Sequence, residues 1–207
     1  MEEEEDNNQK ITKILLASSS PRRKRILKQL NLNFEAFCPE GITEKVYKNP
    51  RKTVKFNSLL KAQFVYNNVI INSLNYKDSI VAGFDTLVYF DGQHIGKPAD
   101  VLQAEYFLGK LSGKNHLVLT GISLIDCNTG RTVTGIDVTR VKFRKLNSVE
   151  IKNYLKNEEV LDKAGAYDIS GFGSILVEKI RGCFYNVAGF PVHKFIELAA
   201  ELNYSIL

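Results

Sequence analysis

The sequence lacks the features that define several protein classes. It contains three cysteines, Cys38, Cys127 and Cys183, which lie far apart without CxxC spacing, a pattern that disfavours a disulfide framework and a zinc knuckle. No apolar run approaches the roughly eighteen residues that a transmembrane helix needs. The first ten residues, MEEEEDNNQK, are acidic and thus unlike a secretory signal or a transit peptide. We therefore expect a cytoplasmic protein with reduced thiols and no membrane partner.

Three common hydrolase signatures are also missing. There is no GxxxxGK[ST] segment, which excludes a P-loop, and no GxSxG nucleophile elbow. His94, His116 and His193 are isolated from one another, without HxH or HExxH spacing, so a zinc hydrolase is excluded as well.

The net charge of +5 conceals an asymmetry along the chain. Residues 2–6 are all acidic, so the remainder carries 28 basic against 18 acidic residues, a net charge of +10. A basic body favours a polyanionic partner, which could be a nucleic acid or a phosphorylated small molecule. We expect residues 1–10 to form a disordered acidic tail and residues 11–207 to form a single catalytic domain.

Apolar periodicity predicts interleaved strands and helices with hairpins in the middle of the chain. Such a pattern is typical of an α/β fold with a mixed, partly antiparallel sheet, in one domain or in two closely packed lobes, and not of a doubly wound parallel sheet. Asn147 and Glu150 have the spacing of a capping box. The expected strands are 11–17, 34–38, 80–84 continuing into 87–90, 93–95, 116–126, 131–143 and 174–180, and the expected helices are 21–30, 52–69, 99–111, 147–157 and one opened by Pro191.

The segment SSSPRRKRILK, residues 18–28, is the most informative. Ser20 is a favourable N-cap and Pro21 suits the first helical position, which places Arg22 and Arg23 in the first turn. Cations there oppose the helix dipole by about 0.3–1 kcal/mol each. Free N–H groups, the hydroxyls of residues such as Ser18, and guanidinium groups instead suit a polyanion. The segment favours a phosphate cradle over a solvated basic face, although a nucleic-acid backbone would fit equally.

A second segment, VAGFDTLVYFDGQHIGKP, carries a candidate catalytic carboxylate. Asp85 is expected at the end of an apolar strand, followed by Thr86, where a carboxylate can hold a divalent metal or orient a water. Lys97, between Gly96 and Pro98, can contact phosphate from a stiff loop.

Three further charged residues give weaker signals. Glu44 lies in a polar loop among basic residues, and Lys61 interrupts the apolar helical stretch LLKAQF. Lys163 precedes a glycine-rich segment that could approach a base or sugar closely. Taken alone, Glu44 and Lys61 are better explained as surface charges, and a simple loop is an equal alternative for the segment at Lys163.

Taken together, the segments resemble the Maf family of nucleotide pyrophosphatases. The matches are LASSSPRRKRIL, GFDTLV, GKP, LSGKNHLVLTG, LDKAGAYDISGFG and NVAGFPV, in family order and from about Ile14 to Val192. The resemblance implies a two-lobed fold of the inosine-triphosphate-pyrophosphatase type with a central cleft. It also implies a divalent metal (Mg²⁺, Mn²⁺ or Co²⁺), a homodimer, and hydrolysis of nucleoside triphosphates to monophosphate and pyrophosphate.

The resemblance also assigns roles by position. Asp85 is implied to accept a proton from water and to help hold the metal, with Glu44 as the second acidic residue. Phosphate and transition-state contacts are implied for the cationic residues Arg22, Arg23, Lys61 and Lys97.

Substrate preference follows from a few positions within the family. Arg22, Arg23 and Thr86 resemble the dTTP/UTP-cleaving branch, whereas the 7-methyl-GTP branch tends toward SPWR and a Gln after the Asp. This chain departs from the family at three positions: Phe84 replaces a small residue, Ser170 replaces a glutamine expected to contact the base, and Asp168 replaces a glycine. A base contact through Ser170 would be looser than one through Gln.

Three hypotheses therefore remain open at the level of sequence. The first is a dTTP/UTP pyrophosphatase. The second is the same chemistry acting on purine or modified nucleotides such as 7-methyl-GTP, ITP or XTP. The third is a non-catalytic nucleic-acid-binding or cell-division regulator, which is disfavoured because the cationic segment lacks interleaved aromatic residues.

Overall fold

The protein is represented by a computed structural model that describes residues 13–70, 74–76 and 78–206. The expected acidic tail, residues 1–10, lies outside them. The strands are β1 (Lys13–Ala17), β2 (Phe34–Phe37), β3 (Ser79–Phe90), β4 (Gln93–Ile95), β5 (Asn115–Asp126), β6 (Thr132–Phe143) and β7 (Val177–Arg181). The α-helices are α1 (Pro21–Gln29), α2 (Pro50–Val65), α3 (Val101–Leu111), α4 (Ser148–Asn157), α5 (Phe184–Val187) and α6 (Val192–Glu201).

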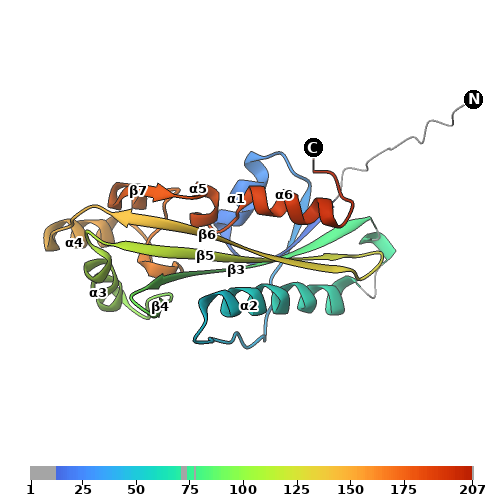
Figure 1. Cartoon of the computed structure of the whole chain (residues 1–207), viewed down its shortest axis with the longest axis horizontal. Coiled ribbons are helices and arrows are strands. Elements are labelled where there is room, and N and C mark those ends of the chain that lie inside the picture. Colours follow the sequence, from blue (N-terminus) through green and yellow to red (C-terminus); the bar gives the residue numbers. More distant parts are fainter. Residues whose placement is uncertain (1–12, 71–73, 77, 207) are drawn as a thin grey trace, which may run out of the picture.

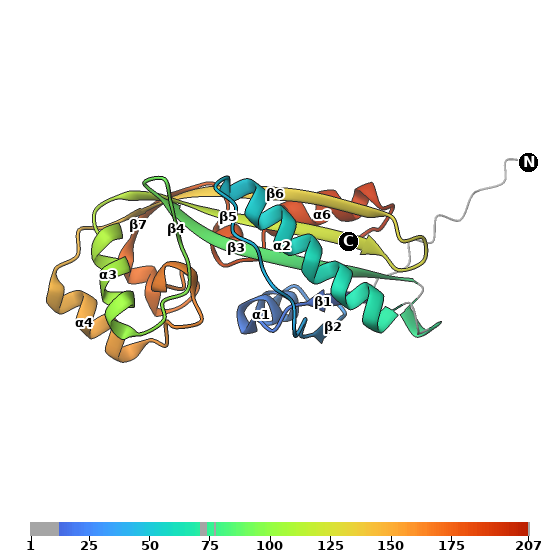
Figure 2. The same ribbon diagram turned by 90° about the horizontal axis from the view of Figure 1, so that it is seen from below.

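The strands form one seven-stranded mixed sheet, which confirms the predicted α/β class. Its order is β2-β1-β3-β5-β6-β7, with β4 paired to β3. Only β1 makes parallel pairs, with β2 and with β3, while the other ladders are antiparallel. The helix α2 lies along one face of the sheet and α6 along the other, whereas α3 and α4 gather at one end of the long strands (Figures 1 and 2).

Alternation along β3 divides the core between these two faces. Ala82, Phe84 and Val88 belong to the large apolar cluster shared with α1, α3 and α6, and Leu87 packs with Val54 of α2. Glycine allows α2 to lie very close to the sheet. A Cβ on Gly83 would come within 2.2 Å of the Ser58 carbonyl oxygen.

The structure corrects one expectation that matters for the site. Asp85 does not end a strand, because β3 runs without interruption from Ser79 to Phe90. The edge of β3 opposite β5 is shared by two short partners, since β1 pairs as far as Gly83 and β4 pairs from Val88 onward. Residues 84–87 therefore have one edge without a strand partner, and Asp85 lies in this gap.

Other boundaries differ more modestly. The helix expected over 52–69 begins at Pro50, its α-helical part ends at Val65, and a π-helical turn continues from Tyr66 to Ile70. The strand expected over 174–180 begins only at Val177, because a 3₁₀ segment (Phe172–Leu176) precedes it. Both hydrogen bonds of the Asn147–Glu150 capping box are present.

The start of α1 also departs from expectation. Ser20 occupies the N-cap position but its side chain makes no capping hydrogen bond. The Oγ of Ser18 instead accepts a hydrogen bond from the Ser20 backbone N–H, at 3.2 Å. None of the helices in the described ranges is long and apolar enough to cross a membrane.

Candidate active site

A cleft of about 740 Å³ opens at the gap in the edge of β3. One wall is formed by the β1–α1 connection, the loop after β2 and α2, and the other by β4, the segment that follows it, and residues 162–168. It brings together most of the residues expected from sequence: Ser18, Ser20, Arg22, Arg23, Glu44, Lys61, Asp85, Thr86 and Lys97.

Arg23 is a buried cation whose hydrogen bonds go to neutral acceptors. Its guanidinium donates to the Gly189 carbonyl oxygen at 2.8 Å, to Ser18 Oγ at 2.8 Å and to Thr86 Oγ1 at 3.1 Å. Burial lowers the pKa of Arg23 to about 10, and the negative charge of Asp85 opposes that shift. Arg23 therefore stays protonated at neutral pH and presents a fixed positive charge to an anionic ligand.

Asp85 and Glu44 converge on a single cation. The Lys61 Nζ lies 2.8 Å from Asp85 Oδ1 and 2.8 Å from Glu44 Oε1. The side chains of Lys61 and Asp85 are only 13% and 10% exposed, whereas that of Glu44 is 49% exposed. The buried pair is thus held firmly by α2 and β3, and the third group comes from a more accessible loop.

Sequence reasoning missed the residue that ties this loop to the site. Asn57 of α2 is buried, and its Nδ2 donates to Asp85 Oδ2 at 3.3 Å and to the Lys45 carbonyl oxygen at 3.1 Å. Its Oδ1 accepts from the Lys45 N–H at 2.9 Å. One turn earlier, Thr53 Oγ1 accepts from the Tyr47 N–H. The available signal was two small polar residues four apart, on the same helix face as Lys61.

Arg22 and Lys97 approach the cleft from opposite walls. Arg22 lies in the first turn of α1, and its guanidinium is 3.7 Å from Asp162 Oδ2 across the cleft. Lys97 follows β4 directly and lines the opposite wall. An anion between the two walls would be flanked by positive charge on both sides.

Two residues expected at the site are not in the cleft lining. Lys163 is buried, and its ammonium group is within 3.4 Å of Glu158 and 3.0 Å of Asp162. Ser170 is exposed and hydrogen-bonded to Asp168, and it is Asp168 that lines the cleft. Phe84 points into the core, where its ring lies 4.7 Å from that of Phe190.

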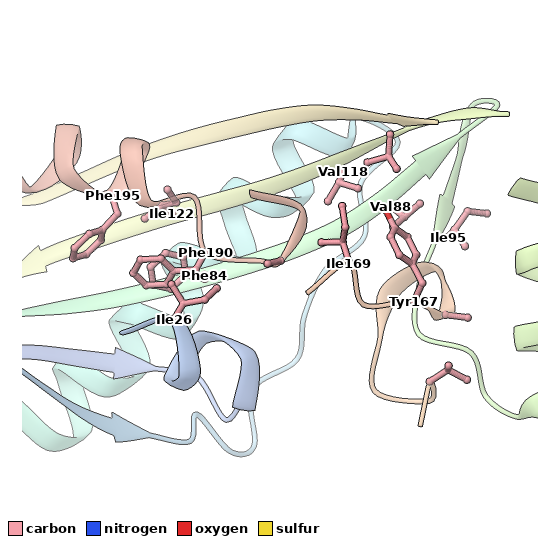
Figure 3. Close-up of a cluster of buried hydrophobic side chains, with 14 of the residues drawn as sticks. Ile26, Phe84, Val88, Ile95, Val118, Ile122, Tyr167, Ile169, Phe190 and Phe195 are labelled. Carbon is pink, nitrogen blue, oxygen red and sulfur yellow. The ribbon is translucent and has the colours of Figure 1, made fainter. Parts of the chain in front are cut away.

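Apolar side chains also line the cleft. Figure 3 shows two groups of buried side chains along β3, with Ile26, Phe84 and Phe190 in the group beside α1. The second group, nearer to β4, includes Val88, Ile95, Val118 and Tyr167, which also line the cleft. These apolar side chains suit a flat heterocyclic ring, whereas the cationic side chains of the cleft suit phosphates.

Few side chains in the cleft are placed to hold a metal ion. Among the described residues, no group of three or more His, Cys, Asp and Glu side chains is arranged to hold a metal ion. Glu44 and Asp85 are nevertheless two carboxylates directed at one cation position, now occupied by Lys61 Nζ. Mg²⁺ is commonly bound by one or two carboxylates together with substrate phosphates and water, so this donor set fits such an ion.

Comparisons with known proteins identify relatives of this chain. Residues 13–202 match the family described as Maf-like protein. The chain is 37% identical over 197 residues to the dTTP/UTP pyrophosphatase of Caldicellulosiruptor saccharolyticus, covering 94% of this chain and 97% of that protein. It is 39% identical over 193 residues to the enzyme of the same name from Carboxydothermus hydrogenoformans, with coverages of 93% and 100%. Among solved structures, the Staphylococcus aureus Ham1 protein aligns with a TM-score of 0.46 and 13% identity, over 64% of this chain and 72% of that one.

Proposed function

The chain belongs to the Maf-like protein family, and from this premise we propose that it hydrolyses nucleoside triphosphates to nucleoside monophosphates and pyrophosphate, with dTTP and UTP as substrates. The preference for dTTP and UTP is taken from the relatives, whose names state it, and it agrees with Arg22, Arg23 and Thr86 in this chain.

One observation carries the proposal. A single cleft holds a buried carboxylate, Asp85, beside cations from three elements: Arg23 of α1, Lys61 of α2 and Lys97 after β4. Cations around a triphosphate stabilise the charge that develops on the leaving pyrophosphate. A carboxylate among them can orient a water molecule and accept its proton.

The hydrogen bonds at Asp85 indicate which oxygen takes that proton. Oδ1 is 2.8 Å from Lys61 Nζ, whereas Oδ2 accepts a longer bond of 3.3 Å from Asn57 Nδ2. Oδ2 is the less engaged oxygen and therefore the better base. The water oxygen bonds to the α-phosphorus while one of its protons passes to Oδ2. The bond between the α-phosphorus and the bridging oxygen breaks, and pyrophosphate leaves with the electron pair of that bond.

A divalent cation (Mg²⁺, Mn²⁺ or Co²⁺) is part of the proposal, held by Glu44 and Asp85. When bound, it would neutralise phosphate charge and polarise the attacked phosphoryl group. Since Lys61 bridges the same two carboxylates, cation binding should shift the pairing of Lys61 toward substrate.

Substitution of Asp85 tests the proposal. Asp85→Asn keeps the shape of the side chain but removes the charge and most of the basicity, so turnover of dTTP should fall at least about 100-fold with the fold intact. The measurement is pyrophosphate release from standard and modified triphosphates, with each of the three metals. Near-normal turnover by folded Asp85→Asn protein would remove Asp85 from the mechanism. No turnover of any triphosphate by the parent protein would refute the function.

We also propose a homodimer. On α3, the side chains of Leu102 and Tyr106 are 76% and 62% exposed and lie one turn apart on the same face. Exposed apolar side chains that adjoin one another can form a patch that another copy of the chain covers. Sedimentation equilibrium should show a dimer that a Leu102→Glu and Tyr106→Glu double variant dissociates, and a monomeric parent protein would contradict it.

The cytoplasm is the proposed location. All three cysteines are free of disulfides, which is typical of a reducing compartment. Fractionation of the source cells, with the protein followed by antibody, would test this assignment.

A further inference from the structure

Asp168 is a buried carboxylate for which the described residues provide no cation. It is only 7% exposed, yet it lines the cleft. Its Oδ1 accepts hydrogen bonds from the Ser170 backbone N–H at 2.9 Å and from Ser170 Oγ at 2.6 Å. In the part of the chain that the structure describes, Oδ2 accepts no hydrogen bond and forms no ion pair. Oδ2 is therefore the oxygen that is free to accept a hydrogen bond from a ligand in the cleft.

The surrounding backbone holds this carboxylate in place. Its neighbours in sequence, Tyr167 and Ile169, are both buried in the core, and the Tyr167 hydroxyl is 2.9 Å from His116 Nε2. Gly173 packs against the Asp168 main chain so closely that a Cβ there would lie 2.5 Å from the Asp168 carbonyl oxygen. Asp168 therefore presents one free acceptor, Oδ2, from a rigid support.

The position of Asp168 identifies which part of a nucleotide it meets. Arg23, Lys61 and Asp85 belong to α1, α2 and the middle of β3. Asp168 follows Tyr167, which is in the same buried apolar group as Val88 and Ile95, and these apolar side chains line the cleft. A planar base fits between such side chains, whereas a ribose, with its hydroxyl groups, fits them poorly.

We propose that Asp168 selects the base by accepting a hydrogen bond from the N3–H of uracil or thymine, with Ser170 as a positioning residue. This inference rests on the proposed function, since it names the base-reading group of that same site. Uracil and thymine present a single donor, N3–H, flanked by two carbonyl groups. Cytosine presents a lone pair at N3, which a carboxylate repels, and its donor is the N4 amino group, which takes the place of the O4 carbonyl of uracil. A carboxylate oxygen directed at N3 therefore favours dTTP and UTP over CTP, whereas one directed at the 4-position would favour CTP.

The sharpest probe is N3-methyl-UTP, in which the donor is absent and the rest of the nucleotide is unchanged. The parent protein should cleave UTP more efficiently than N3-methyl-UTP by about 10- to 100-fold in kcat/KM, as for hydrogen bonds to charged groups elsewhere. In Asp168→Ala this ratio should fall toward one. Ser170→Ala should lower it less, because the carboxylate remains.

Asp168→Asn keeps the volume of the side chain and guards against misfolding of the alanine variant. Its amide can donate as well as accept, so CTP should gain relative to UTP. The matched control is Asp91→Asn, at an exposed turn position with φ of 50°, which Asn tolerates well. That control should leave all substrate ratios unchanged.

Four results would overturn the assignment. The first two are equal cleavage of UTP and N3-methyl-UTP by the parent protein, and an unchanged ratio of the two efficiencies in Asp168→Ala. The third is a preference of the parent protein for GTP over UTP. The fourth is a change in Asp168→Ala that is confined to the UTP-to-dUTP ratio, which would place Asp168 on the ribose. Calorimetric binding of UMP and N3-methyl-UMP tests Asp168 independently of hydrolysis. Failure of the proposed function would appear as absent pyrophosphate release, while failure of this inference would appear as equal affinity for the two monophosphates.

Discussion

Replacement of Asn57 by alanine tests whether the loop that carries Glu44 is held in place by α2. The substitution removes three hydrogen bonds, of 2.9 and 3.1 Å to the Lys45 main chain and of 3.3 Å to Asp85 Oδ2. At about 0.5–1.5 kcal/mol each, with the longest at the low end, they contribute about 1.5–3 kcal/mol. Alanine recovers up to about 0.7 kcal/mol through its higher helix propensity.

The expected net loss of stability for Asn57→Ala is therefore about 1–2.5 kcal/mol. In a chain of this size each kcal/mol shifts the midpoint of thermal unfolding by about 2–4 °C, so the change is measurable. Turnover should fall about 10-fold or more, because Glu44 is no longer held beside Lys61 and Asp85. KM should change less than turnover does, because the phosphate-binding cations remain.

Two further variants separate the hydrogen bonds from the volume of the side chain. Asn57→Asp keeps the shape but places a second carboxylate against Asp85, and it should reduce turnover more than alanine does. Asn157→Ala is the matched control, because that amide makes only a surface hydrogen bond, to the Asn153 carbonyl oxygen at 2.7 Å. If Asn57→Ala unfolds and turns over like this control, Asn57 does not hold the loop.

The remaining predictions concern ligand linkage, packing and pH. Arg22→Ala should change the stability of the free protein by less than about 0.5 kcal/mol, because its ion pair with the half-exposed Asp162 is long, at 3.7 Å, and contributes little. The variant should be stabilised less by pyrophosphate in thermal unfolding, and an undiminished shift would mean that Arg22 does not bind phosphate. Gly83→Ala should yield little folded protein, since its Cβ would meet the Ser58 carbonyl oxygen at 2.2 Å, and a normal circular dichroism spectrum and melting curve would contradict the close approach of α2. Burial lowers the pKa of His116 to about 4. Between about pH 6.5 and 4 the unfolded chain therefore binds a proton that the folded chain does not. The free energy of unfolding should fall by about 1.4 kcal/mol per pH unit as the pH drops through this window. Denaturant unfolding of the parent and His116→Gln proteins across that range checks the slope, which should be shallower in the variant.

Much of the fold could be predicted from local signals. The paired β5 and β6, the Asn147 capping box and the helical positions after Pro21 depend on periodicity and end signals within a few residues of each other. Boundaries failed where a neighbour in space intervenes. β3 continues through Asp85 because β5 pairs with it from Ile80 to Tyr89, and that pairing cannot be read from the residues of β3.

The same division applies to the candidate site. The sequence by itself determined which chemical groups are available, because residue types and spacings predict phosphate contacts for Arg22, Arg23 and Lys97 and a water-activating role for Asp85. Only the tertiary structure decided which of them meet. The gap in the edge of β3 is left by β1 and β4, which come from distant parts of the chain. Asn57 became visible as a link between Asp85 and the Glu44 loop, and Asp168 replaced Ser170 in the cleft lining, because burial and direction of a side chain are set by contacts between elements remote in sequence.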